Sequence, residues 1–341
     1  MKEPLLTIVI PCYNEEEVIK ETIAQLSLVL IKMIHEQLIH QQSKLLFVDD
    51  GSKDRTWEII LEVSEANPFV SGIKLARNAG HQHALLAGMM KAREYSDCVL
   101  TIDADLQDDI SVIRDFVQKY RNGYEIVYGV RSKRQTDTLF KRTTAVLFYR
   151  FMKKMGVSLV HNHADYRLLS KSALDELSRY GERNVFLRGL IPLLGFRSTT
   201  VMYERKERLA GKSKYPLKKM LAFAFDGITS FSVAPIRWIT MLGFLFFFSS
   251  GIFGGYAAIQ RLIGYTTPGW TSLIISIWLI GGIQLMGIGL IGEYIGKIYK
   301  EVKCRPRYAI ETDLYACRMK AQQLLASPPR PEPEQNRRNE A

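Results

Sequence analysis

The chain has 341 residues, of which 47% are hydrophobic, and its formal net charge is +11. This apolar content is typical of a core-forming protein, which excludes intrinsic disorder over most of the length. The positive charge calls for an anionic partner or location, and nucleic acid, acidic lipid headgroups and phosphorylated substrates all qualify.

The first two-thirds of the chain alternates short apolar runs with longer amphipathic segments. The runs that predict buried strands are Leu5–Ile10, Lys44–Val48, Val70–Leu75, Cys98–Ile102 and Glu125–Tyr128. The segments that predict helices are Glu15–Ile34, Asp54–Ser64, His83–Arg93 and Ile110–Tyr120. This alternation predicts an α/β domain over residues 1–215 with a Rossmann-like, mostly parallel sheet. Ligands of such domains bind at the carboxyl ends of the strands.

Residues 216–235 predict an amphipathic helix, because Leu217, Leu221, Ala224 and Ile228 recur at helical spacing. Such a stripe is typical of an interfacial helix that lies on a bilayer. A helix packed on the α/β domain is the alternative.

Residues 236–296 predict a two-helix transmembrane hairpin. Trp238–Ile259 and Thr271–Gly292 carry no charge, and each is long enough to cross a hydrocarbon core of about 30 Å. The alternative, two buried helices of a soluble protein, is disfavoured because both segments are apolar on every side. The connector Gln260–Trp270 carries one charge, whereas the outer flanks are strongly basic, which predicts that both flanks and both termini are cytoplasmic.

Basic residues gather on either side of this hairpin, from Arg197 to Lys219 and from Lys297 to Arg307. Positive charge next to membrane segments favours lipid over nucleic acid as the anionic partner. Residues 297–326 are therefore expected to form a cytoplasmic juxtamembrane segment, and residues 327–341 a disordered tail. Close approach of the helices is expected at four glycines, and association of hairpins into a homo-oligomer stays open. These glycines are Gly251, Gly255, Gly287 and Gly292.

Asp103 and Asp105 follow an apolar strand and are separated by one residue. Residues two apart on an extended chain point the same way, so both carboxylates can reach one ion. Carboxylate oxygens suit Mg²⁺ or Mn²⁺, which are completed by the phosphates of a substrate. The pair therefore predicts a metal site for a phosphorylated ligand.

Two further polar clusters follow predicted strands. Asp49 and Asp50 end one strand, and Pro11, Tyr13 and Glu15 follow the first. Turn and cap chemistry explains any single cluster. Polar clusters after three strands together indicate an α/β nucleotide site.

The strings PCYNEE, DDGSKDRT, RNAGHQ and DADLQD, in this order, resemble family 2 glycosyltransferases with the A-type nucleotide-sugar fold. DYRLL, ERKERLAGKSKYPLKKM and GEYIGKIYKEVKCRPRY resemble a narrower group, the polyprenyl-phosphate glycosyltransferases, especially the bactoprenol glucosyltransferases. The resemblance covers roughly Leu5 to Tyr308. It implies a nucleotide-sugar donor, usually a UDP-sugar, and a polyprenyl phosphate acceptor.

The resemblance also implies roles for individual residues. Glu15 and Asp50 would contact the nucleoside, and Pro11, Tyr13 and Asp49 belong to the same donor-binding clusters. Asp103, Asp105 and Gln107 would bind metal and diphosphate, with Asp105 counted among the catalytic residues, and Arg131 would face the donor phosphates.

Asp165, in DYRLL, is the other candidate catalytic residue. An Asp here is a plausible general base when the acceptor is a hydroxyl. A lipid phosphate has a second pKa of about 6 and carries little proton to remove. We therefore expect Asp165 to orient the acceptor or the sugar at least as much as it removes a proton; the alternative is a turn cap beside Arg167.

The basic cluster Arg205, Arg208, Lys212 and Lys214 is a candidate site for the lipid phosphate, because Arg binds phosphate in bidentate fashion. General attraction to acidic lipid is the alternative. The expected reaction is an inverting transfer of one sugar, glucose first, at the cytoplasmic face of the membrane. N-acetylglucosamine, mannose or modified arabinose would be other sugars. A processive synthase and a membrane-tethered basic scaffold rank lower, since QxxRW is absent and a scaffold needs no Asp103–Asp105 pair.

Overall fold

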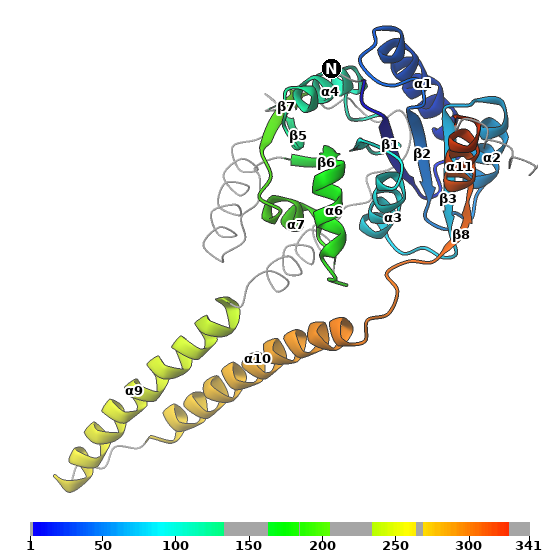
Figure 1. Ribbon diagram of the computed structural model, residues 1–341. Coiled ribbons are helices and arrows are strands. Elements are labelled where there is room, and N and C mark those ends of the chain that lie inside the picture. Colours follow the sequence, from blue (N-terminus) through cyan, green and yellow to red (C-terminus); the bar gives the residue numbers. More distant parts are fainter. Residues whose placement is uncertain (1–2, 133–162, 184, 205–233, 264–268, 327–341) are drawn as a thin grey trace, which may run out of the picture.

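The computed structural model describes residues 3–132, 163–183, 185–204, 234–263 and 269–326. Its centre is a sheet flanked by helices on both faces, from which two long helices extend (Figure 1). The strands are β1 Leu6–Cys12, β2 Lys44–Asp49, β3 Val70–Leu75, β4 Cys98–Thr101, β5 Ile126–Arg131, β6 His163–Ser170, β7 Ser198–Tyr203 and β8 Ile310–Asp313. The helices are α1 Ile19–His35, α2 Thr56–Ala66, α3 His81–Arg93, α4 Ile113–Arg121, α6 Lys171–Arg179, α7 Leu187–Leu193, α9 Ala234–Leu262, α10 Trp270–Val302 and α11 Leu314–Ala326, with a short 3₁₀ turn at Ile110–Val112.

The sheet has the strand order β7-β5-β6-β4-β1-β2-β3-β8. Neighbours are parallel except β6, which runs antiparallel to β4 and β5, and β8, which runs antiparallel to β3. The α/β class and the mostly parallel sheet predicted from the sequence are thus confirmed. All the strands predicted from apolar runs are present, with ends shifted by a few residues.

Both faces of the sheet are buried, as the alternation of side chains along β1 illustrates. Leu6, Ile8 and Ile10 point into a core closed by α1, α2 and α4. Val9, between them, points into the opposite core, which α3, α6, α7 and α11 cover. A sheet covered on both faces reads as continuous apolar runs, which is why the sequence located β1 to β5.

The chain returns to the sheet after α10. β8 pairs with β3, and Tyr315 of α11 is fully buried with its hydroxyl 2.9 Å from Thr7 Oγ1. Part of the expected juxtamembrane segment, residues 297–326, therefore completes the α/β domain, and residues 297–302 are the end of α10. The sequence could not indicate this return, because β8 is a short edge strand with mixed exposure.

The two long helices α9 and α10 lie side by side and project from the α/β domain (Figure 1). Within the described chain, one segment is long and apolar enough to cross a membrane, Leu279–Val302, and none of its most apolar window is buried. α9 offers a shorter apolar stretch, Pro235–Leu245. One candidate span is thus found where two were predicted.

The expected close approach of α9 and α10 is seen at one of the predicted glycines whose surroundings are described. A Cβ at Gly287 would lie 3.4 Å from Ile239 Cγ2 of α9. A Cβ at Gly255 or Gly292 would meet nothing within 4 Å. The interfacial helix falls on residues 216–235, of which 216–233 lie outside the described residues, as does the tail 327–341.

Candidate active site

The polar loops predicted from the sequence lie together at the carboxyl ends of the central strands. β1, β2 and β4 are parallel neighbours, so their carboxyl ends meet there. β6 is antiparallel to β4 and begins at this edge, with Thr101 opposite Arg167. Continued by two residues, this register brings Asp103 beside Asp165. Residues far apart in the sequence thus build one site.

Asp165 is buried and surrounded by basic groups. Its Oδ1 accepts a hydrogen bond from the guanidinium of Arg167, and its Oδ2 lies 3.1 Å from Nη2 of Arg188 at the start of α7. Gln82 Nε2 donates to Oδ2 at 3.4 Å. Burial opposes ionisation, but Arg167, Arg188 and His81 together hold the pKa of Asp165 well below its ordinary value. Asp165 is thus a fixed negative charge.

His81 connects two of the carboxylates. Its Nε2 lies 3.4 Å from Asp165 Oδ2 and 3.7 Å from Asp103 Oδ1. Burial alone would lower the pKa of this imidazole, but Asp165 and Asp103 raise it above its ordinary value. His81 is the first residue of α3, so the packing of that helix on the sheet sets its position.

One carboxylate oxygen of Asp103 is buried without a hydrogen bond. Its Oδ1 is buried and accepts no hydrogen bond, although 32% of the side chain is exposed. Burial raises the pKa of Asp103 to about 6, with the neighbouring Asp165 and Asp108 adding to the effect and His81 opposing it. A cation at this position would offset both the lost hydrogen bonding and the repulsion.

Asp105 lies in a turn just beyond Asp103. β4 ends at Thr101 and residues 104–105 form a turn, so the expected placement of both carboxylates on an extended chain does not hold. Asp105 Oδ1 accepts from the backbone N–H of Gln107 at 3.2 Å, and Gln107 is buried. The turn closes at Leu106, which has a positive φ of 53°.

The donor set fits a divalent cation held partly by substrate. Asp103 supplies a buried oxygen without a hydrogen-bond partner, and Asp105 lies in the turn that follows it. Across the described residues there is no cluster of three or more His, Cys, Asp or Glu side chains able to form a closed cage. Mg²⁺ commonly uses one or two carboxylates plus substrate phosphates, so this set suits an ion that arrives with a nucleotide diphosphate.

Asp50 holds the loop that leads into α3. Its Oδ1 accepts from Ala79 N at 2.7 Å and its Oδ2 from Gly80 N at 2.9 Å. Burial raises the pKa of this carboxyl, and the two backbone bonds oppose the rise. Because His81 follows directly, Asp50 fixes the start of the helix that carries the imidazole.

Asp49 and Gly51 shape the same turn. Asp49 is fully buried, and its Oδ2 accepts from Ser52 N at 3.2 Å, while its Oδ1 has no hydrogen-bond partner. Gly51 has a φ of +68°, and a Cβ there would lie 2.8 Å from the backbone of Arg77 and of Asn78. Only glycine allows this approach between the loops.

The loop after β1 is tied to the loop after β2. Asn14 donates its N–H to Ser52 Oγ at 3.0 Å, and Asn14 Oδ1 accepts from Lys53 N at 2.8 Å. Glu15 N donates to Thr56 Oγ1 at 2.9 Å. Pro11 is buried at the end of β1, and Tyr13 is partly exposed in this loop. Hydrogen bonds from Asn14 and Glu15 thus connect the first loop to the second loop and to the start of α2.

Arg131 ends β5 beside Tyr203, which ends the parallel strand β7. Arg131 Nε donates to the Tyr203 hydroxyl at 3.1 Å, and its Nη2 lies 3.4 Å from Asp108 Oδ1. Tyr203 donates to the same Asp108 oxygen at 2.7 Å. This triad connects Arg131 to the loop that carries Asp103 and Asp105.

The sequence did not predict Arg188 or Tyr203 as site residues, whereas His81 in RNAGHQ was expected to shape the donor loop and Asp108 ends the string DADLQD. Arg188 and His81 begin helices and reach Asp165 only through packing, so spacing in the sequence carries no signal for them. The predicted lipid-phosphate residues Arg205, Arg208, Lys212 and Lys214 lie outside the described residues.

The sequence matches the family described as glycosyl transferase family 2 over residues 7–178. This range covers β1 to β6, with every carboxylate discussed above. The chain therefore belongs to glycosyl transferase family 2. The loops at the carboxyl ends of β1, β2 and β4 form its candidate active site.

Relatives extend the similarity beyond that domain. The Bacillus subtilis (strain 168) protein named uncharacterized glycosyltransferase YkoT is 64% identical over 313 residues, which are 92% of this chain and 93% of that protein. The SfII prophage-derived bactoprenol glucosyl transferase of Shigella flexneri is 38% identical over 310 residues, 90% of this chain and 97% of that protein. Both alignments are long enough to include part or all of α9 and α10.

Among solved structures, the mannosyl-3-phosphoglycerate synthase of Rubrobacter xylanophilus aligns with a TM-score of 0.45 at 15% identity, over 70% of this chain and 75% of that one.

Proposed function

We propose that this enzyme transfers a single sugar, glucose, from a UDP-sugar to a polyprenyl phosphate at the cytoplasmic face of the membrane. The observation that carries the proposal is the 38% identity to a bactoprenol glucosyl transferase over 90% of this chain and 97% of that protein. The product would be a polyprenyl-phosphate-linked sugar for modification of cell-surface glycans.

The reaction would be a single displacement with inversion. An oxygen of the lipid phosphate attacks the anomeric carbon, and the bond from that carbon to the nucleotide diphosphate breaks. The acceptor phosphate has a second pKa of about 6, so it is largely dianionic at neutral pH and needs no strong base. Positioning and charge neutralisation would supply most of the rate.

Asp165 would act as a positioning group in this scheme. A carboxylate paired with Arg167 and Arg188 is a weak base, because its pKa is held well below the ordinary value. It would keep Arg188 and His81 oriented toward the space beside Asp103. Their positive charges could then face the phosphates of the donor or the acceptor.

Asp103 and Asp105 would hold Mg²⁺ or Mn²⁺ together with the donor diphosphate. The ion would neutralise the negative charge that develops on the departing nucleotide. The buried Oδ1 of Asp103, which accepts no hydrogen bond, supports this assignment. Arg131, the loop carrying Glu15 and the buried Asp50 would form the rest of the donor site.

The membrane hairpin would keep the donor site beside an acceptor that cannot leave the bilayer. Large apolar side chains of α9 and α10 are exposed in the protein, among them Phe244, Phe248, Leu285 and Met286. An apolar surface of this extent is typical of contact with lipid. We therefore propose that α9 and α10 both span the membrane, with the α/β domain and both termini on the cytoplasmic side.

The test is transfer of label from a panel of radiolabelled UDP-sugars to undecaprenyl phosphate, using the full chain purified in detergent with Mg²⁺ or Mn²⁺. We expect one donor to label the lipid phase and EDTA or Asp105→Ala to abolish the signal. Asp115→Ala, which changes an exposed aspartate of α4, is the matched control and should keep full activity.

The panel also separates the alternatives. Label from N-acetylglucosamine, mannose or modified arabinose would keep the reaction and change the sugar. No transfer from any donor, together with polyanion binding that weakens steeply with salt, would instead support a basic scaffold and contradict the proposal.

A further inference from the structure

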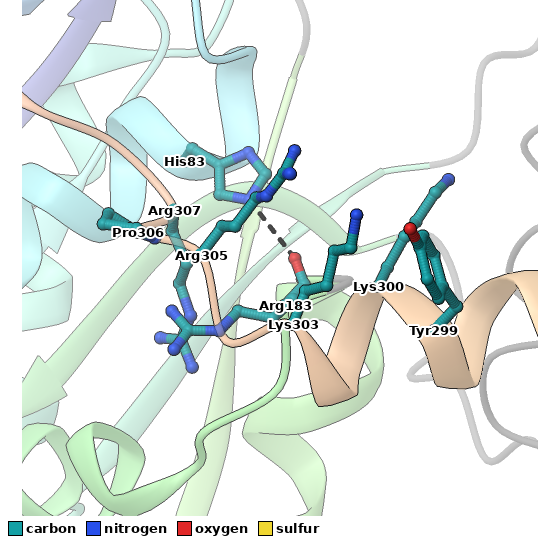
Figure 2. Close-up of a pocket in the computed structure, with 8 residues that line it drawn as sticks. All are labelled: His83, Arg183, Tyr299, Lys300, Lys303, Arg305, Pro306 and Arg307. Atoms are coloured by element: carbon teal, nitrogen blue, oxygen red, sulfur yellow. Dashed lines mark hydrogen bonds between the residues drawn. The ribbon is translucent and has the colours of Figure 1, made fainter.

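A polar cavity lies where the end of α10 meets the α/β domain (Figure 2). Its volume is about 270 Å³, and six of the residues that line it carry basic side chains: His83, Arg183, Lys300, Lys303, Arg305 and Arg307. His83 comes from α3, Arg183 from the loop after α6, and the others from the end of α10 and the segment beyond. Three parts of the chain therefore bring positive charge to one place.

Two guanidinium groups in this cavity each have a buried N–H without an acceptor. Nε of Arg183 and Nε of Arg307 are both buried and have no hydrogen-bond partner. Arg183 Nη2 donates to Cys304 O at 3.0 Å, and Arg307 Nη2 donates to Tyr180 O. Backbone contacts thus fix both side chains while one donor of each stays unused. A buried donor without an acceptor is costly, and an oxygen-rich anion would remove that cost.

The charge balance of the cavity is also incomplete. Burial and the neighbouring Arg183 lower the pKa of Arg307, which indicates repulsion between the two guanidinium groups. The nearby acidic groups are Glu182 and Glu301, and the Glu301 carboxylate already accepts the backbone N–H of Arg183 at 2.8 Å from each oxygen. Five lysine and arginine side chains line the cavity and two carboxylates lie near Arg307, so positive charge is in excess and an anion would reduce it.

The position of the cavity indicates where that anion comes from. Lys300 lies within the candidate membrane span Leu279–Val302, and Lys303 follows directly after its end. Lys303 Nζ lies 4.2 Å from the ring centroid of Tyr299, which is exposed. Tyrosine and lysine at the end of an apolar helix are typical of the headgroup layer, where the lysine extends its charge toward phosphate.

We propose that this cavity binds the phosphate of an anionic phospholipid headgroup and thereby fixes the α/β domain against the bilayer. The shape of guanidinium favours bidentate contact with phosphate, and Arg183 and Arg307 present such groups side by side (Figure 2). The inference rests on the membrane location in the proposed function, but not on the sugar-transfer reaction.

The test measures lipid binding by native mass spectrometry of the full chain in neutral detergent, titrated with phosphatidylglycerol or phosphatidylcholine and without donor. We expect saturable binding of phosphatidylglycerol. Arg183→Gln and Arg307→Gln should each weaken it about tenfold or more, the loss expected for one charge-assisted hydrogen bond. Binding of phosphatidylcholine should stay weak in every variant. Arg55→Gln, which changes an exposed arginine just before α2, is the matched control.

Separate controls test whether the variants fold and which molecule supplies the bound phosphate. Because Arg183 and Arg307 also bond the backbone, Lys300→Gln and Arg305→Gln provide exposed changes that should weaken binding without lowering the melting temperature. Unchanged phosphatidylglycerol affinity in all four variants would overturn the proposal. So would displacement of the phospholipid by undecaprenyl phosphate or inorganic phosphate at equal concentration, since either would assign the cavity to acceptor or to free anion. The lipid-binding measurement uses no sugar donor, so failure of the proposed transferase activity would not change the measured affinity.

Discussion

Asp165 illustrates how one side chain can be found from the sequence while its task depends on its neighbours. The string DYRLL marked the residue, and the preference for orientation over proton removal came from the chemistry of a phosphate acceptor. The structure surrounds it with Arg167, Arg188 and His81, of which the last two come from other parts of the chain. These contacts support the orienting role. The spacing of residues in the sequence could not reveal them, because Arg188 and His81 reach Asp165 only in the folded protein.

The substitution Asp165→Asn tests that role. It removes a buried charge that offsets Arg167 and Arg188, and breaking such a pair costs about 3–5 kcal/mol of folding stability. Because the native pKa lies well below the ordinary 3.8, the stabilisation is present above that value and is lost only as the pH falls toward the native pKa. Thermal unfolding should therefore show a wild-type advantage that persists down to about pH 5 and decreases as the pH rises through the raised pKa of His81, because the attraction between His81 and Asp165 is then lost.

Residual sugar transfer by Asp165→Asn should not recover as the pH rises above neutral. Activity that recovers steeply at high pH would instead identify Asp165 as a general base, because hydroxide would be replacing it. Asp175→Asn, an exposed aspartate of α6 that pairs with Arg93, serves as the control for loss of a single ion pair.

Helix α3 is the element that delivers His81 to the site, and its distance from the sheet is set by a glycine. A Cβ on Gly88 would lie 2.4 Å from Val9 Cγ1 and 2.7 Å from Val48 Cγ2. The helix therefore packs directly on β1 and β2 through that position. The sequence predicted the helix as His83–Arg93, two residues short of His81, so its active-site end was missed.

The change Gly88→Ala should push α3 away from the sheet. Alanine favours a helix by about 1 kcal/mol, but overpacking a core costs about 1–3 kcal/mol, so we expect a lower melting temperature and weaker transfer. Gly181→Ala, where a Cβ would meet nothing within 4 Å, should leave both unchanged. An unaltered melting temperature for Gly88→Ala would mean that the helix does not rest on the sheet as described.

Strands β6, β7 and β8 were not predicted from the sequence, for two physical reasons. β6 contains Asp165 and Arg167, whose buried charges interrupt the apolar pattern. β7 and β8 lie at the two edges of the sheet, where side chains alternate in exposure or stay polar. Strands β1 to β5 were predictable because a sheet covered on both faces selects continuous apolar runs. The edge strands form because they pair with strands distant in the sequence, and a local sequence pattern does not show that pairing.

The packing of α11 on the sheet allows a test of how much the chain after α10 contributes to the stability of the α/β domain. Tyr315 donates or accepts hydrogen bonds with Thr7 and Ser96 at 2.9 and 3.2 Å, inside the core. Tyr315→Phe should lower stability by about 1 kcal/mol, seen as a reduced melting temperature of the α/β domain. The exposed Tyr299→Phe is the control, and equal melting temperatures would show that α11 adds little to the domain.

The whole molecule combines a covered α/β domain with a pair of helices whose apolar side chains are exposed. In a soluble protein, exposed Leu285 of α10 could be replaced by lysine at little cost. In a bilayer, lysine near the centre of a spanning helix costs about 2.5–3.5 kcal/mol, and lysine near the end costs much less because it reaches the headgroups. Leu285→Lys should therefore shift the full chain out of the carbonate-resistant membrane fraction.

Val302→Lys, at an equally exposed position at the end of the candidate span, is the matched control and should stay in that fraction. Two variants that both remain membrane-integrated would show that α10 does not cross the bilayer at Leu285. Two variants that both leave it would point to a general loss of folding, which thermal unfolding of the α/β domain detects. Only a difference between the two positions supports a helix that spans, because depth in the bilayer is the one property that separates these exposed apolar side chains.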